Sequence, residues 1–310
     1  MIDPKKVLML VRREVWENRS LWIVPLVISA VTLLALALGG NMDGGAGIHF
    51  GHDADSGPDS SPESSSLSPF VSITKRQAAY AIGISGVTFT QLLVLAIMVF
   101  FYLLDSLLAE RKDRSILFWK SLPISDAEVV TSKALTGLVL TPIYVLLVSA
   151  VTQILAGIVV WLRLSNTGIG DLIPAVDFAV WAKVQVAFWT LAPAVILWYL
   201  PLAAYLLLVS VWARKNAFLW AVLPPVAILL IEGRLLRSHH VAEFLAHRFV
   251  GVYRLLNLDS MRDSPGGSPL VEFIGHVGNV FVSYETWLGV LVAAVMFVAV
   301  VRIRRYRDDS

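Results

Sequence analysis

Long runs of apolar residues, separated by polar segments, divide the chain into six stretches that could each cross a membrane. A membrane-spanning helix needs about 20 mostly apolar residues. The predicted spans are, in chain order, residues 21–38, 78–108, 134–162, 181–212, 217–231 and 286–301. The fifth is short and contains Pro224-Pro225, so it could either cross the bilayer or re-enter it. The pattern predicts an all-α polytopic membrane protein with six transmembrane helices.

Two further segments repeat apolar residues at helical spacing without forming a long apolar run. In residues 1–20, apolar side chains fall on one face and most charged side chains fall away from it, which predicts an in-plane amphipathic helix. Residues 232–284, an outer segment, contain a second such pattern, formed by Val241, Phe244, Leu245, Phe249, Val252 and Leu256. The other outer segment, 41–76, is rich in Gly, Ser, Pro and Asp and is typical of a loop.

The N-terminal helix is expected to lie under anionic lipid headgroups. The residues expected at the membrane surface are Lys5, Lys6, Arg12, Arg13 and Trp16. A basic segment before the first span could also serve only to orient the chain in the membrane. Both interpretations give the bilayer as a partner, and residues 21–310 then form the transmembrane permease domain discussed below.

Charge and composition set the expected orientation. Hydrophobic residues make up 57% of the chain and charged residues 15%, whereas a soluble domain carries about 25% charge. If six spans cross, most of the 25 Lys and Arg residues fall on the side of both termini and of residues 110–133. Because Lys and Arg near span ends favour the cytoplasmic side, we expect both termini in the cytoplasm and the chain in the inner (plasma) membrane.

Motifs of the common enzyme classes do not occur in the sequence. The chain has no cysteine, no phosphate-binding G-x-x-x-x-G-K-[ST] loop, no H-E-x-x-H zinc motif and no G-x-S-x-G turn. We therefore expect that it is not an enzyme by itself, carries no cofactor and binds no nucleic acid.

Two histidine-containing stretches invite comparison with metal sites. They are "HFGHDAD", with His49, His52, Asp53 and Asp55, and "HHVAEFLAH", with His240, Glu243 and His247. The first is better explained as a solvated loop and the second as the wet face of a helix, so no metal site is expected.

Polar residues inside the spans are few and uncharged near the bilayer centre. They are Gln91, Gln153, Gln185, Thr136, Thr141 and Thr190. Such groups more often join helices than bind cargo. The missing mid-span charge argues against an ion-coupled transporter and against an intramembrane enzyme.

The segment "ERKDRSILFWKSLPISDAEVVTSK", residues 110–133, is expected on the cytoplasmic side. A short helix is predicted over 113–120, and Pro123 limits its continuation. Ser125 with Glu128 forms an S-x-x-E capping box, which predicts that a second helix starts here and continues into the third span. Phe118 and Trp119, surrounded by charges, could dip into lipid or form a protein docking site.

This segment resembles the coupling helix of type-2 ABC exporter permeases, because "DRSILFWKSLPIS" begins with Asp-Arg and ends with Leu-Pro-Ile-Ser. Ser132-Lys133 stands where that family usually has Gly-Lys. The layout is also similar: an N-terminal in-plane helix, six spans and outer helices between spans five and six.

The resemblance implies a transmembrane subunit that pairs with a second permease subunit and is driven by a separate ABC ATPase, which binds ATP and magnesium. The residues expected to contact the ATPase are Asp113, Arg114, Phe118, Trp119, Lys120, Leu122 and Pro123. Glu14 and Glu17 could meet the same partner or pair within the chain. The alternative is a structural or regulatory membrane protein without net transport.

Overall fold

The structure, a computed structural model, describes residues 3–39, 69–113, 124–165, 177–236, 240–256 and 269–306. Every regular element within these ranges is a helix. Six helices are long and apolar enough to cross a membrane: Ser20–Leu38, Tyr80–Lys112, Asp126–Arg163, Phe178–Trp212, Ala217–Arg234 and Tyr284–Tyr306. The prediction of an all-helical protein with six candidate spans is therefore confirmed.

The helices follow one another along the chain with short described connections. They are α1 (Pro4–Glu17), α2 (Ser20–Leu38), α3 (Pro69–Lys112), α5 (Asp126–Leu135), the π-helix η1 (Thr136–Leu140), α6 (Thr141–Ser165), α7 (Phe178–Trp212), α8 (Ala217–Ile231), the π-helix η3 (Glu232–Leu236), α9 (His240–Leu256), α10 (Pro269–Val282) and α11 (Tyr284–Tyr306).

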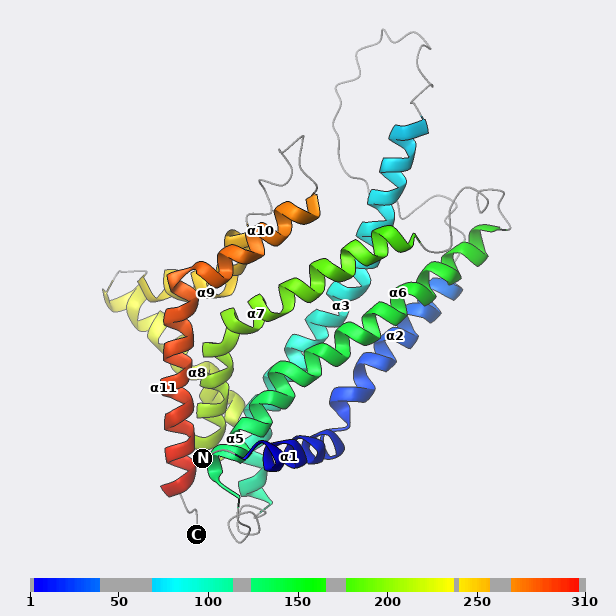
Figure 1. Cartoon of the computed structure of the whole chain (residues 1–310). Coiled ribbons are helices and arrows are strands. Elements are labelled where there is room, and N and C mark those ends of the chain that lie inside the picture. Colours follow the sequence, from blue (N-terminus) through cyan, green and yellow to red (C-terminus); the bar gives the residue numbers. More distant parts are fainter. Residues whose placement is uncertain are drawn as a thin grey trace.

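Local sequence signals account for several helix ends. Asp3 caps α1 and Asp177 caps α7, in each case through a carboxylate that accepts backbone N–H groups of the first turn. Asn216 adopts a left-handed conformation, with φ of 35°, and this permits the sharp turn from α7 into α8. Pro193 and Pro201 lie inside α7, and Figure 1 shows this helix bent near its middle.

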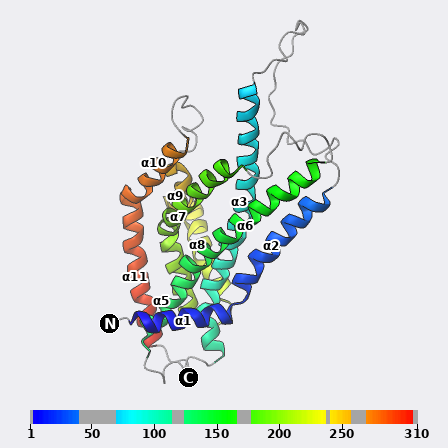
Figure 2. The same cartoon turned by 45° about the vertical axis from the view of Figure 1, so that its right-hand side comes forward.

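The six long helices stand side by side, and α1 lies across one end of the bundle (Figures 1 and 2). We call this end the base; it contains α1, α5, the last turns of α3 and α11, and both ends of the described chain. α9 and α10 lie at the opposite end, which we call the far end. The main core between them is formed by leucines and small residues of α3 and α7, with Val130 of α5 and Val300 of α11.

The observed spans are longer than the apolar runs that predicted them. α3 begins at Pro69 rather than near residue 78, and the third span begins at Asp126 and passes through η1 into α6. The fifth span gains length because η3 continues α8, giving 18 residues, or about 27 Å at 1.5 Å per residue. This is close to the thickness of a bilayer core.

The segment between the fifth and sixth spans contains two helices. α9 coincides with the apolar pattern at 241–256, whereas α10 was not predicted from any pattern in the sequence. α10 packs against α7 and α9, and its Val277 and Val280 are buried with Trp198 of α7. Tertiary packing therefore orders a stretch that the sequence pattern left as a mixed segment.

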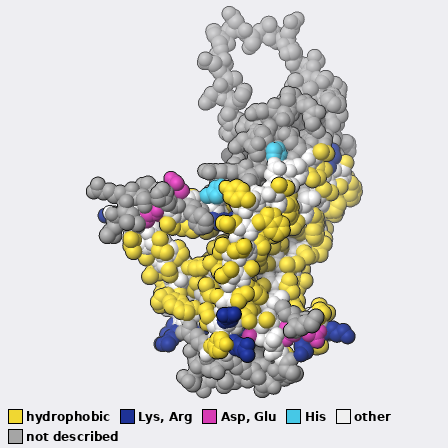
Figure 3. Space-filling view, turned by 60° about the vertical axis from the view of Figure 1, so that its left-hand side comes forward, with side chains coloured by type: hydrophobic (Ala, Val, Ile, Leu, Met, Phe, Trp, Pro, Cys, Tyr) yellow, Lys and Arg dark blue, Asp and Glu magenta, His cyan; other side chains and the backbone are white. Residues whose placement is uncertain are grey.

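Side chains are sorted by type along the bundle. Figure 3 shows a broad hydrophobic band with basic and acidic side chains gathered below it, at the base. An apolar band of this kind is what a lipid-facing surface requires. The described part of the chain thus has the surface of a multi-pass membrane protein.

Candidate functional site

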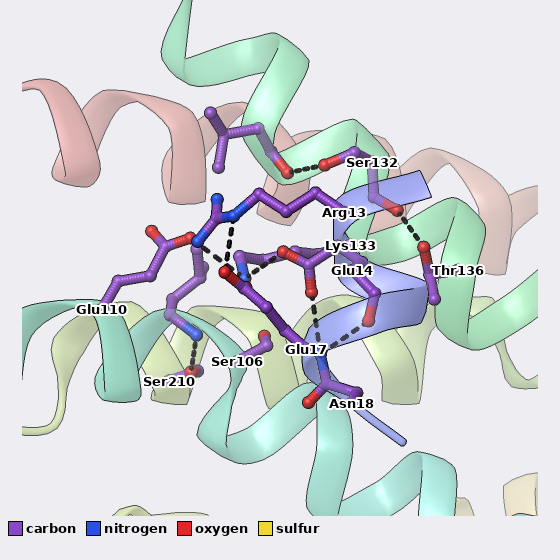
Figure 4. Close-up of polar contacts among 12 residues, drawn as sticks. Arg13, Glu14, Glu17, Asn18, Ser106, Glu110, Ser132, Lys133, Thr136 and Ser210 are labelled. Atoms are coloured by element: carbon purple, nitrogen blue, oxygen red, sulfur yellow. Dashed lines mark hydrogen bonds and ion pairs between the residues drawn. The ribbon is translucent and has the colours of Figure 1, made fainter. Parts of the chain in front are cut away.

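The most unusual feature of the described residues is a group of charged side chains buried at the base. Glu14 of α1, Glu110 of α3, Lys133 of α5 and Arg304 of α11 are each no more than 5% exposed. Figure 4 shows Glu14, Glu110 and Lys133 converging from their three helices. We call these four residues, together with Asp126, the base network.

Lys133 is at the centre of the network. Its Nζ lies 2.9 Å from Oε1 of Glu14 and 3.1 Å from Oε1 of Glu110. The other Glu14 oxygen accepts hydrogen bonds from the Tyr102 hydroxyl, at 3.0 Å, and from the Asn18 amide, at 3.2 Å. One ammonium group therefore joins α1, α3 and α5 in a region with little access to water.

Arg304 extends the network to the last span. Its Nη1 lies 2.7 Å from Oε2 of Glu110, and its Nε lies 3.0 Å from Oδ1 of Asp126. Glu110 thus binds both cations at once. Because a buried charge is strongly destabilising unless it is paired, these contacts hold the ends of α3, α5 and α11 in one geometry.

The network residues occupy positions that helical spacing would give to apolar side chains. Glu14 shares the buried face of α1 with Val7 and Leu10, and Glu110 follows Leu103 and Leu107 at spacings of three and four. Their charge therefore made them look like surface residues in the sequence. The only sequence signal was the placement of Lys133 at the family's Gly-Lys position.

A second set of contacts fixes the start of α5. Glu128 accepts the backbone N–H of Ser125 at 2.8 Å, and the Ser125 hydroxyl accepts the N–H of Glu128 at 3.3 Å. The predicted capping box is therefore confirmed. The second Glu128 oxygen accepts the N–H of Asp3 at 2.9 Å, so the same carboxylate also attaches the start of α1 to α5.

The base network lies at the two ends of the predicted coupling segment. Asp113 directly follows the last turn of α3, and its N–H bonds to the carbonyl of Ala109. The chain is described again from residue 124, immediately before the Ser125 cap. The other residues predicted to contact an ATPase lie outside the described residues: Arg114, Phe118, Trp119, Lys120, Leu122 and Pro123.

The end of α3 is also tied to α7. Arg111 donates through Nη2 to the carbonyls of Ser210, at 2.6 Å, and Ala213, at 2.7 Å. These carbonyls belong to the last turn of α7 and the residue after it, where helix carbonyls lack partners and a cation is favourable. All the elements that flank the predicted coupling segment are thus joined by charged groups.

A cavity of about 890 Å³ opens beside the network. α2, α3 and α8 supply apolar walls, among them Val24, Phe101 and Phe218, whereas Glu17 and Asp105 contribute charge. This volume lies within the range of small-molecule sites, and the mixed lining suits an amphiphilic molecule.

The predicted membrane-surface residues divide into two groups. Lys5, Arg12 and Trp16 are exposed, whereas Lys6 and Arg13 are partly buried. Arg13 pairs with Glu17 at 2.6 Å, one turn along α1. Glu14 and Glu17, whose partners the sequence left open, therefore both pair within the chain.

The glutamines inside the spans join helices, as expected. Gln91 donates to Ser29 of α2 at 2.8 Å, and Gln153 donates to the carbonyl of Ile84 in α3 at 2.9 Å and also accepts from Gln185 of α7. The three span threonines differ, because Thr136, Thr141 and Thr190 bond to carbonyls of the preceding turn of the same chain segment.

The far end is held by an aromatic contact. Trp198 of α7 is fully buried and donates from Nε1 to the carbonyl of Arg248 at 2.8 Å, while the Arg248 guanidinium lies 4.5 Å from the Trp198 ring centre. Burial lowers the pKa of Arg248, and the Glu285 carboxylate opposes this effect. His247 lies 2.8 Å from Glu285, so α9 is attached to both α7 and α11.

Neither end offers a set of groups suited to catalysis or metal binding. Within the described residues, no three His, Asp or Glu side chains are arranged to hold a metal ion, and Glu243 does not gather with His247 for this purpose. The histidines at 49, 52 and 240 have side chains outside the described part. The base network can instead transmit movement, since it couples four elements rigidly.

Comparisons with known protein families, with characterised proteins and with solved structures found no match to this chain.

Proposed function

We propose that this chain is the transmembrane permease subunit of an ABC transporter, working as an exporter. A separate ATPase subunit would supply the energy from ATP and magnesium, and a second permease subunit would complete the pathway. The base is then the cytoplasmic side of the inner (plasma) membrane, and both termini are cytoplasmic. The enrichment of Lys and Arg at the base supports this orientation.

The observation that carries the proposal is the anchoring of residues 114–123 at both ends. Movement applied to this segment by an ATPase must reach the spans without being absorbed by local bending. Glu110 and Lys133 connect its two flanking helices directly, and Arg304 and Glu14 connect them to α11 and α1. A segment that served only as a turn between spans would not require charged groups buried on four elements.

Two variants test the docking role of the segment. Phe118→Asp and Trp119→Ala are expected to abolish ATPase capture and ATP-driven export while the permease still inserts into the membrane. The measurement is co-purification of a soluble ATPase with the tagged chain, followed by ATP hydrolysis and export in reconstituted vesicles. Phe178→Ala is the matched control, because Phe178 is an aromatic residue that is 65% exposed at the opposite end of the bundle.

The outcomes separate the alternatives. If both coupling variants retain ATPase capture and export, the docking role is wrong. If an ATPase is captured and hydrolyses ATP but vesicles show no net flux of any compound exported by the parent cells, the chain is a regulatory or structural partner instead.

The orientation can be measured independently. The natural chain has no cysteine, so Lys120→Cys creates a single reactive thiol. A membrane-impermeant maleimide is expected to label it in inside-out vesicles and not in intact cells. Labelling from outside intact cells would overturn the proposed orientation and with it the ATPase contact.

A further inference from the structure

An apolar groove runs along α1 where this helix meets the third span. Its volume is about 450 Å³. The lining residues are Pro4, Val7, Leu8 and Val11 of α1, Thr131 and Leu135 of α5, and Val139 and Leu140 of η1. All of them are apolar except Thr131, so the groove offers almost no hydrogen-bonding group to a polar ligand.

The groove is open on the surface of the bundle. Leu8 is 71% exposed, and Leu135 and Val139 are 39% and 40% exposed. Figures 1 and 2 show α1 lying across the base while the third span rises from it, so the groove lies in the angle between a crosswise helix and a membrane-spanning helix. In a multi-pass membrane protein this angle falls near the boundary between hydrocarbon and headgroups.

Two basic side chains without partners flank the groove. Lys5 and Arg12 are seven residues apart on α1, so they project from the same face about 10 Å apart along the axis, on either side of Leu8. Both are exposed, and neither side chain makes an ion pair or hydrogen bond with any described residue.

The other two basic residues of α1 behave differently. Arg13 is paired with Glu17, and Lys6 lies within electrostatic range of Glu128. The helix therefore uses one pair of basic residues inside the protein and leaves the pair beside the groove available.

We propose that this groove binds an anionic glycerophospholipid, with an acyl chain against Leu8, Leu135 and Val139 and the headgroup phosphate at Lys5 and Arg12. The apolar lining suits a hydrocarbon chain, and the unpaired cations suit a phosphate. The bound lipid would bridge α1 and the third span. This site does not depend on the transport function and remains whether or not an ATPase partner exists.

Native mass spectrometry of the full chain in detergent, titrated with phosphatidylglycerol, measures the binding. Lys and Arg at a membrane surface each contribute about 1 kcal/mol toward anionic lipid, so Lys5→Gln with Arg12→Gln is expected to weaken binding roughly 30-fold. The matched control is Lys6→Gln with Arg13→Gln, which removes the same charge from the same helix and is expected to weaken binding less than about threefold. Equal losses in the two double variants would mean diffuse attraction to a basic helix and would overturn the site.

A second pair of variants tests the apolar part without changing charge. Leu8→Ser removes part of the groove wall and is expected to weaken phosphatidylglycerol binding several-fold. Met9→Ser, at a neighbouring residue that is 68% exposed and does not line the groove, is expected to leave binding unchanged. Equal effects of the two serine variants would contradict the groove.

Two competing ligands complete the design. Phosphatidylcholine is expected to bind at least tenfold more weakly than phosphatidylglycerol, and millimolar inorganic phosphate is expected not to displace the lipid. Equal binding of the two lipids, or displacement by inorganic phosphate, would show that an anionic lipid is not the ligand.

Discussion

The base and the far end of the bundle are both cross-linked, but by interactions of different kinds. At the base, ion pairs among Glu14, Glu110, Lys133 and Arg304 join α1, α3, α5 and α11. At the far end, Trp198 and the backbone around Arg248 join α7 to α9, with small residues where helices approach closely. Paired charges tolerate little rearrangement, whereas aromatic packing is sensitive mainly to volume.

This difference bears on what each end can do. A network in which one cation binds two carboxylates on different helices fails as a unit when any member is removed. That property suits an element that must transmit displacement without bending. The far end, held by packing, suits a structure that closes the opposite side of the bundle.

Removing the central cation should have the largest effect. Lys133→Met leaves the Glu14 and Glu110 carboxylates buried without their shared partner, which is expected to cost about 3–5 kcal/mol of unfolding free energy. The measurement is denaturant or thermal unfolding of the purified chain in one detergent. Lys215→Met, at an exposed lysine of the base, is the control and should change stability by less than about 0.5 kcal/mol. A loss below about 1 kcal/mol for Lys133→Met would mean that the network adds little to the base.

The far end should respond to added volume instead. A Cβ at Gly251 would lie 2.7 Å from Cζ2 of Trp198, whose ring is buried and hydrogen-bonded, so Gly251→Ala is expected to cost about 1–3 kcal/mol. Gly275→Ala on α10 meets nothing within 4 Å and should be neutral or slightly stabilising, because alanine favours helix. Unfolding of both variants in the same detergent provides the comparison, and equal effects would show that the close approach of α9 to Trp198 is unimportant.

The cap at the start of α5 should have an intermediate effect. Ser125→Ala removes the acceptor for the Glu128 N–H and is expected to cost about 1 kcal/mol. Ser125→Asp keeps a capping oxygen and should remain close to the natural chain. The same unfolding measurement distinguishes them, and an equal loss in the aspartate variant would mean that the hydroxyl itself, rather than capping, is required.

The smallest effect is expected from the exposed ion pair of α1. Glu17→Gln breaks the contact with Arg13 and should cost about 0.3–0.5 kcal/mol at low salt. In 1 M salt, where the screening length is about 3 Å, this loss should vanish, whereas the effect of Lys133→Met should persist because its partners are buried. Unfolding at two salt concentrations tests this, and a Lys133→Met effect that disappears in salt would show that the network is wetter than the structure has it.

The candidate site was predictable only in part. The Ser125 cap follows from residue type and spacing alone, since a capping box is local to four residues. The base network could not be predicted in this way, because its members are separated by up to 194 residues and only packing brings Glu110 and Arg304 together. The aromatic residues Phe118 and Trp119 were singled out from sequence, and their role remains a prediction.

What the sequence determined by itself is the membrane character of the chain. Long apolar runs must form helices in a bilayer, because every backbone group has to be paired internally, and this made six spans readable without a structure. The tertiary structure alone decided which polar residues are buried and which helices they join. A charged residue has the same local signal whether it meets water or a partner from a distant helix, so Glu14, Lys133 and the packing of α10 could emerge only from the folded arrangement.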